Sequence, residues 1–231
     1  MTRQVIIPAG GMGERLGEAL PKALVPLCGI PLLVRTLSAF LPLGLADTAV
    51  VTIPAGHESS IAALLEEAFP DNHITLVPGG VERQDSVRNA LAALRSDTEL
   101  VAIHDAARPF VTGDAVEASF EAAARVGAAT VAVPAIDTIL VSDGDGYLSE
   151  TPDRSTVWYC QTPQTFQVAI IREAHETALR KSFQGTDDAT LVRRCGQSVK
   201  LVRGDFTNLK VTTPTDMIIA ETFIEKNLVC V

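Results

Sequence analysis

The chain has 231 residues, of which 47% are hydrophobic, enough for one sizeable α/β domain with a buried core. Its formal net charge is −9, from 19 Lys and Arg against 28 Asp and Glu, which argues against a nucleic-acid-binding surface. Apolar runs are too short to span a bilayer and Met1 begins no signal-peptide pattern, so we expect a cytoplasmic protein without membrane contact. The four cysteines lack metal-ligand spacing, and we expect free thiols.

A glycine-rich loop follows the first predicted strand, RQVII. The loop is PAGGMGERLGEALPK, Pro8 to Lys22, with three glycines, Gly10, Gly11 and Gly13, and two cations, Arg15 and Lys22. Glycines allow the backbone to approach a ligand with its N–H groups directed at an anion. The glycines alone are equally consistent with a plain chain reversal. The Pro21–Lys22 pair is the distinguishing detail, and the loop predicts a triphosphate site.

The following segments alternate between helix and strand, a pattern typical of a parallel sheet covered on both faces. Predicted helices start at Pro31 and span 56–69 and 113–127, whereas predicted strands span 48–53, 73–77, 100–103 and 129–134. Ligands of open α/β sheets bind beyond the carboxyl ends of the strands. The loops that follow these strands are therefore the candidate sites.

One such loop, PGGVERQDSV at 78–87, places Gly79 and Gly80 directly after a strand. Asp85 or Ser86 is a candidate N-cap for the next helix, which leaves the paired glycines unexplained. A second loop contains His104 and Asp105, with an arginine at position 108. A carboxylate and an arginine here suit metal and phosphate binding, and an Asp–Arg pair that stabilises a turn is the alternative. We interpret His104 as a strand-end residue rather than a metal ligand.

The alternation breaks at residues 135–166, where the Asp-Gly pairs of SDGDG predict a β-hairpin. We interpret this segment as a projecting arm. Its half-apolar side chains, among them Tyr147, Leu148 and Trp158, favour dimerisation through the arm. A lid that folds over its own active site is the alternative.

The C-terminal part continues with a helix at 167–182, a strand at VKLV and a terminal helix that begins at Thr213–Asp216. Capping is a sufficient reason for Thr186, Asp187 and Asp188 to precede a helix. Lys210 follows the last strand, at a position where a lysine is ordinarily solvated.

Seven segments together resemble the 2-C-methyl-D-erythritol 4-phosphate cytidylyltransferase family along essentially the whole chain. In order they are PAGGMGERLGEALPK, GGVERQDSV, HDAARPF, IDTI, PDRSTVWYCQTPQTF, GTDDATLV and TNLKVTTPTD. The resemblance implies one domain over 1–231, with a mostly parallel Rossmann-like sheet of the nucleotide-diphospho-sugar transferase type and a β-arm insertion at about 135–160. It also implies a homodimer joined through the arm, Mg²⁺ or another divalent cation, and CTP and a polyol phosphate as substrates.

The resemblance also implies roles for individual residues. The implied catalytic residues are Arg15, Lys22 and Lys210. The implied CTP-binding residues are Ala9, Gly10, Gly11, Gly80, Ser86 and Asp105. The implied acceptor-binding residues are Arg108, Thr138, Arg154, Thr162 and Thr186. Asp105 is the candidate metal ligand. Thr138 and Arg154 lie on the arm and would hold the acceptor's phosphate at the partner subunit's site.

Two alternatives stay open at this point. Gly10 stands where the family most often has alanine, and QTPQTF and KVTTP also occur in the ribitol 5-phosphate cytidylyltransferases, which differ in their acceptor. The second alternative is a catalytically silent nucleotide-binding module. Because binding alone does not require Arg15, Lys22, Asp105 and Lys210 together, the sequence favours an enzyme.

Overall fold

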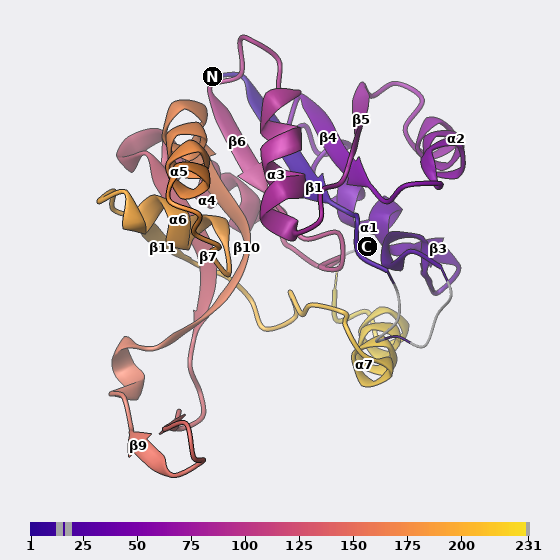
Figure 1. The fold of residues 1–231 in the computed structure, drawn as a ribbon. Coiled ribbons are helices and arrows are strands. Elements are labelled where there is room, and N and C mark those ends of the chain that lie inside the picture. The colour runs from indigo at the N-terminus through magenta and orange to yellow at the C-terminus, as the bar shows by residue number, and fades with distance from the viewer. Residues whose placement is uncertain (13–15, 17–19, 230–231) are drawn as a thin grey trace.

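A seven-stranded sheet is the centre of the computed structural model, which describes residues 1–12, 16 and 20–229 (Figure 1). Its order is β11-β7-β10-β6-β1-β4-β5. The strands are β1 (Arg3–Pro8), β4 (Thr48–Ile53), β5 (Ile74–Pro78), β6 (Leu100–Ile103), β7 (Ala128–Pro134), β10 (Trp158–Gln167) and β11 (Lys200–Arg203). Every neighbouring pair is parallel except those of β10, which runs antiparallel to β6 and β7. The predicted mostly parallel, Rossmann-like α/β sheet is confirmed.

Helices cover both faces of the sheet. One face packs against α1 (Leu32–Ser38), α2 (Glu58–Ala68) and α4 (Gly113–Val126), and the other against α3 (Arg83–Ala92), α5 (Val168–Arg180) and α6 (Asp188–Arg194). The last helix, α7 (Pro214–Glu225), packs in a separate apolar cluster around Leu27, Leu32 and Phe110. No helix in the described ranges combines the length and apolar character of a membrane span.

The structure corrects the interpretation of residues 135–166 as a projecting arm, because residues 158–167 form β10, an interior strand of the sheet. Its residues Gln164 and Thr165 are fully buried although they are polar. Gln164 Nε2 lies 3.2 Å from Thr130 Oγ1, and the hydroxyls of Thr165 and Ser119 are 2.7 Å apart. These hydrogen bonds remove the penalty of burying polar groups, which is why a polar sequence occupies the middle of the sheet. Residues 158–160 pair with β7, so the projecting segment ends near residue 157.

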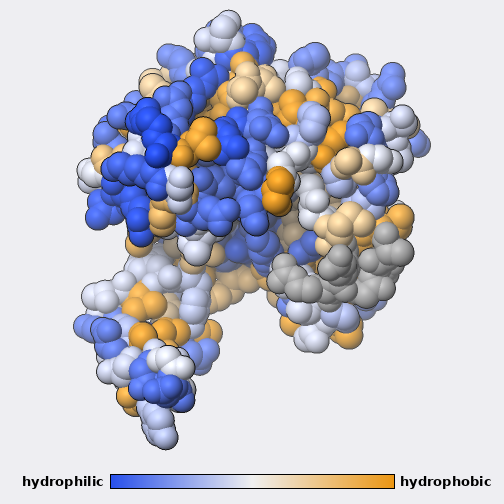
Figure 2. All heavy atoms as spheres, in the orientation of Figure 1, coloured by the Kyte–Doolittle hydropathy of each residue, from blue (hydrophilic) through white to orange (hydrophobic). Residues whose placement is uncertain are grey.

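The hairpin at SDGDG is confirmed. Strands β8 (Val141–Ser142) and β9 (Leu148–Glu150) pair antiparallel, and Asp143 Oδ1 accepts the N–H groups of Asp145 and Tyr147 in the turn. Figure 1 shows this hairpin extending away from the sheet. We call residues 135–157 the arm. Its large exposed apolar side chains are Ile136, Leu140, Val141, Tyr147 and Leu148. Figure 2 shows hydrophobic patches, in orange, on the projecting part of the molecule.

Two helix starts test the capping predictions. Helix α3 begins at Arg83, and its N-cap is Glu82 in a capping box with Asp85, so neither Asp85 nor Ser86 is the N-cap. Helix α7 begins with the expected capping box between Thr213 and Asp216.

The cysteines at positions 28, 160 and 195 are free thiols as expected, and Cys230 lies outside the described residues.

Candidate active site

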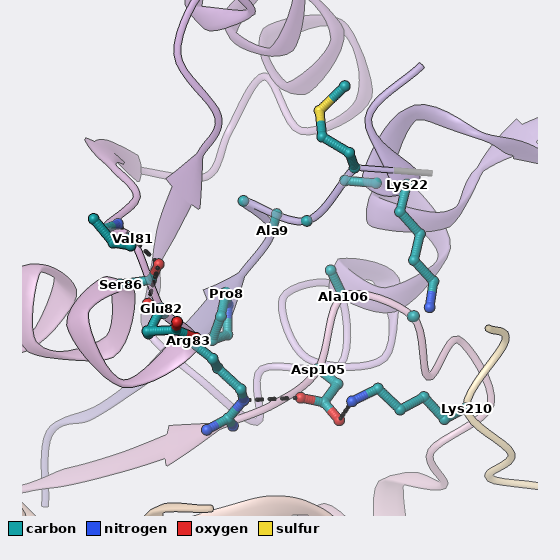
Figure 3. Close-up of a pocket in the computed structure, with 16 residues that line it drawn as sticks. Pro8, Ala9, Lys22, Val81, Glu82, Arg83, Ser86, Asp105, Ala106 and Lys210 are labelled. Atoms are coloured by element: carbon teal, nitrogen blue, oxygen red, sulfur yellow. Dashed lines mark hydrogen bonds and ion pairs between the residues drawn. The ribbon is translucent and has the colours of Figure 1, made fainter. Parts of the chain in front are cut away.

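A pocket of about 300 Å³ lies at the carboxyl ends of β1, β5 and β6 (Figure 3). Its lining joins the three loops that the sequence singled out separately: Pro8 to Met12 with Lys22 and Ala23; Gly80 to Arg83 with Ser86; and Asp105 to Ala107 with Lys210. This location is the one at which open α/β sheets bind ligands. Eight of the predicted site residues therefore meet in one cavity: Ala9, Gly10, Gly11, Lys22, Gly80, Ser86, Asp105 and Lys210.

The glycine-rich loop starts directly at the end of β1. The N–H of Ala9 donates to the carbonyl of Thr52 (2.9 Å), which holds the loop start to β4. The N–H of Lys22 donates to the carbonyl of Gly11 (3.1 Å) and brings the far end of the loop back to its beginning. A Cβ at Gly10 would come no closer than 3.9 Å to a neighbour, so the position also accommodates the alanine common in the resembling family. Gly13 and Arg15 lie outside the described residues.

The second loop owes its shape to Gly80 and Ser86. A Cβ on Gly80 would lie 2.2 Å from the Cβ of Asp85, so only glycine fits where the loop packs on the first turn of α3. The buried Ser86 hydroxyl accepts the N–H of Gly80 (2.9 Å) and donates to the carbonyl of Glu82 (3.2 Å). The glycine that capping left unexplained is therefore required by packing.

Asp105 is the centre of the charged groups in the pocket. Its Oδ2 lies 2.8 Å from Lys210 Nζ and 3.5 Å from Arg108 Nε, and its Oδ1 lies 3.4 Å from Arg83 Nε. Burial alone would raise the pKa of Asp105, but the three cations outweigh burial and hold that pKa well below its usual range. Three positive side chains around one carboxylate leave excess positive charge, which suits a phosphate-bearing ligand.

Arg108 combines a structural role with its place beside Asp105. Its Nη1 donates to the carbonyl of Asn208 (2.8 Å), and burial lowers the pKa of Arg108. The N–H of Arg108 also donates to the carbonyl of Asp105 (3.0 Å). The turn-stabilising interpretation of this pair is thus compatible with its place in the charged cluster. Lys210, by contrast, is not an ordinary solvated lysine, because it pairs with Asp105.

Thr162 and His104 hold the backbone of Asp105 through a chain of hydrogen bonds. The Thr162 hydroxyl accepts the N–H of Asp105 (3.1 Å) and donates to His104 Nδ1 (3.0 Å). His104 Nε2–H then donates to the carbonyl of Arg108 (2.9 Å). Burial lowers the pKa of His104 to about 4, so the ring is neutral at pH 7 and matches this pattern. His104 is a strand-end residue, as interpreted from the sequence.

The described residues that line the pocket include none of the five predicted acceptor-binding residues, Arg108, Thr138, Arg154, Thr162 and Thr186. Thr138 and Arg154 are exposed on the arm, where Arg154 Nη1 donates to the carbonyl of Ile136 (3.0 Å). Thr186 is exposed next to Asp187, whose side chain caps α6 by accepting the N–H of Thr190 (2.7 Å). Capping thus explains Asp187.

Sequence reasoning missed Arg83 and the role of Asp188. Arg83 Nη1 lies 2.7 Å from Asp188 Oδ2, and Asp188 is buried beside His175 rather than acting as a helix cap. The available signal was an arginine at a helix start, directly after a strand and paired glycines. Figure 3 shows the Arg83 side chain directed at Asp105.

The donor set of the pocket fits Mg²⁺ held mainly by substrate. Within the described ranges, no group of three or more His, Cys, Asp or Glu side chains is arranged to hold a metal ion. Asp105 and Glu82 are the carboxylates among the described lining residues. Mg²⁺ in nucleotide sites commonly takes one or two protein carboxylates and completes its octahedron with phosphate oxygens and water. A pocket that offers a carboxylate such as Asp105 is compatible with Mg²⁺ held in this way.

Comparisons with known proteins identify the family of the chain. The family model for 2-C-methyl-D-erythritol 4-phosphate cytidylyltransferase matches residues 4–226. The enzymes of that name from Syntrophus aciditrophicus and Symbiobacterium thermophilum are 43% and 45% identical, each over 96% of this chain and over 95% and 92% of their own lengths.

Solved structures show the same fold. The 4-diphosphocytidyl-2C-methyl-D-erythritol synthase of Anaerococcus prevotii superimposes with a TM-score of 0.88 at 30% identity, over 97% of this chain and 96% of that one. The cytidylyltransferase of Thermus thermophilus gives 0.80 at 37% identity, over 97% and 100%. Because the family model and these relatives match nearly the full chain, the protein belongs to the 2-C-methyl-D-erythritol 4-phosphate cytidylyltransferase family.

Proposed function

We propose that this chain transfers CMP from CTP to 2-C-methyl-D-erythritol 4-phosphate and releases pyrophosphate, in isoprenoid precursor biosynthesis in the cytoplasm. The observation that carries the proposal is the single pocket in which the glycine-rich loop, Lys22, Asp105 and Lys210 meet. A site that only binds a nucleotide needs no lysine held at 2.8 Å to a buried carboxylate beside the phosphate loop.

The reaction needs positioning and charge neutralisation rather than a general base. The acceptor's phosphate monoester is already anionic, and one of its oxygens attacks the α-phosphorus of CTP as the bond to pyrophosphate breaks. Lys22 and Arg15 would neutralise the departing pyrophosphate, and Lys210 the charge that builds on the α-phosphoryl oxygens. Mg²⁺, with Asp105 as its protein ligand, would neutralise the triphosphate.

Base recognition is proposed for the loop around Gly80. The close packing of Gly80 on Asp85 brings the backbone of residues 80–83 to the pocket wall. Ser86 holds this loop and lines the pocket beside it, which supports the proposal that both residues would contact the cytosine. Ala9, Gly10 and Gly11 would bind the phosphates through their backbone.

Acceptor binding is proposed to be shared between two subunits of a homodimer. Arg108, Thr162 and Thr186 would serve the pocket of their own chain, Thr162 by supporting Asp105. Thr138 and Arg154 project on the arm and would complete the partner subunit's pocket. The exposed apolar side chains of the arm are the surface through which the two chains would join.

The test measures pyrophosphate release from CTP and Mg²⁺ with purified protein. We expect release with 2-C-methyl-D-erythritol 4-phosphate, little with D-ribitol 5-phosphate, and none after EDTA is added. A Lys22→Ala variant that folds normally should lose turnover. Release with ribitol 5-phosphate alone would reassign the acceptor, and absence of release with both would overturn the proposal.

A further inference from the structure

A buried carboxylate lies behind the pocket. The Asp188 side chain is 1% exposed at the first residue of α6, and its Oδ1 lies 3.0 Å from His175 Nε2. The backbone N–H groups of Asp188 and Ala189 both donate to Gln164 Oε1, at 2.9 and 3.0 Å. Burial would raise the pKa of Asp188, but the Arg83 charge and the hydrogen bonds with His175 and Arg83 together outweigh burial and lower that pKa. Asp188 is therefore a fixed negative charge.

Arg83 joins this fixed charge to the pocket. Its Nη1 lies 2.7 Å from Asp188 Oδ2, while its Nε faces Asp105 Oδ1 at 3.4 Å. Burial alone would lower the pKa of Arg83, but the two carboxylates raise it above its ordinary value. A planar guanidinium presents donors in fixed directions and so serves two carboxylates at once, which a lysine ammonium at the end of a flexible stem does not reproduce.

The two oxygens of Asp105 have different partners. Arg83 faces Oδ1, whereas Lys210 lies 2.8 Å from Oδ2. The Lys210 side chain is 41% exposed, and Asp105 is the ion-pair partner that holds its ammonium at the pocket. If the carboxylate of Asp105 rotated, Lys210 would lose its fixed place.

We infer that Arg83 is a positioning residue for the reaction: anchored on Asp188, it sets the orientation of Asp105 and thereby places Lys210 at the reacting phosphate. The inference rests on the proposed function, since it deepens the role of Lys210 in that reaction. It also connects the start of α6, next to Thr186, to the loop that carries Gly80. Arg83 does more than stabilise the fold, because its Nε faces Asp105, a carboxylate that lines the pocket.

Helix α3 offers a matched control. Arg88 lies on the same helix, pairs with Asp85 at 2.7 Å, and has a side chain 33% exposed against 31% for Arg83. Neither Arg88 nor its pair reaches Asp105. Replacing either arginine by lysine keeps one charge and one possible ion pair on α3, so the two variants differ in contact with the pocket rather than in net charge.

The experiment compares Arg83→Lys and Arg88→Lys with the wild type, by steady-state kinetics with CTP and 2-C-methyl-D-erythritol 4-phosphate and by thermal melting. For Arg83→Lys we expect kcat to fall about 10- to 100-fold, the range typical of a displaced reacting group. The KM for CTP should change less than about threefold, since the loops that bind CTP are intact. Melting should stay near that of the wild type. Arg88→Lys should match the wild type throughout.

A double variant separates positioning from folding. Arg83→Met with Asp188→Asn removes both charges, leaves an amide oxygen for His175, and avoids an unpaired buried carboxylate. Wild-type kcat in Arg83→Lys, or in a well-folded double variant, would overturn the inference. A low kcat in both, with melting near wild type, supports it. Failure of the proposed function itself is distinguished by the wild type, which would then release no pyrophosphate.

Discussion

A single carboxylate sets the charge arrangement of the pocket. Asp105 is held by Thr162 through its backbone and by three cations through its side chain. Removing Lys210, the most exposed of those cations, leaves Arg83 and Arg108 as partners of the carboxylate. Substitutions at the exposed end of this cluster should therefore change chemistry more than stability.

Lys210→Ala should fold normally and lose turnover. Lys210 is the most exposed cation of the cluster, and Asp105 keeps Arg83 and Arg108 as partners when Lys210 is removed. The loss of stability should therefore stay at about 1 kcal/mol, which shifts melting by about 3 °C. We expect kcat to fall about 100-fold or more, as when one stabilising donor of a charged transition state is removed. Lys200→Ala, at an exposed lysine of β11, is the control and should keep wild-type turnover. Near-normal kcat in Lys210→Ala would contradict this role.

His104 should make the fold sensitive to mild acid. Its pKa of about 4 in the fold lies below the ordinary 6.5, so the unfolded chain binds a proton first as the pH falls. The stabilising contribution is present above pH 6.5 and is lost as the pH falls toward 4. Between pH 6.5 and 5, where Asp105 with its lowered pKa stays ionised, the loss is about 1–2 kcal/mol.

Urea unfolding at pH 6.5 and pH 5 would measure this effect. His104→Asn should lose less unfolding free energy between the two pH values than the wild type does, although its starting stability is lower. The exposed His73, replaced by Asn, should keep the wild-type difference. An equal decline in His104→Asn and the wild type would assign the pH dependence to other groups.

At the scale of the element, the sequence predicted what hydrophobic pattern and turn chemistry specify. The apolar strand at 48–53 and the hairpin at SDGDG appear where they were expected. Strand β10 was not predicted, because its sequence is polar. Gln164 can be buried in it only because Thr130 of β7 is its hydrogen-bond partner, and no local sequence pattern reveals that contact. Arg83 was missed for the same reason, since its partner Asp188 lies 105 residues away in the chain.

The arm should be required for dimerisation. Leu148 lies on β9, is 63% exposed and belongs to the apolar surface of the arm. A charge at this position would lose its hydration in the dimer interface, which would weaken dimerisation. Leu148→Asp should shift the protein from dimer to monomer in sedimentation equilibrium at micromolar concentration. Leu179→Asp, at a leucine 57% exposed on α5, should leave the dimer intact. A monomeric wild type would instead favour the arm as a lid over its own pocket.

At the scale of the whole molecule, the fold separates the pocket from the arm. Lys22, Asp105 and Lys210 line one cavity at the carboxyl ends of the strands. The arm, whose sequence includes Arg154, projects away from the sheet (Figure 1). A two-fold symmetric pair of chains allows each arm to reach the other chain's pocket. In that arrangement every active site contains residues of both chains. A pocket substitution can then be placed in one chain of a dimer and an arm substitution in the other.

Mixed dimers test this arrangement. Lys210→Ala and Arg154→Ala chains, each nearly inactive at low acceptor concentration, should regain activity when they are unfolded and refolded together. In a mixed dimer one site combines the intact pocket with the intact arm, so random pairing restores about a quarter of wild-type activity. Lys210→Ala refolded with Lys22→Ala is the control: both defects lie in pockets, each mixed dimer has two damaged sites, and activity should stay low. Recovery in neither mixture would mean that Arg154 acts in the pocket of its own chain, because each chain would then carry one damaged site whatever its partner.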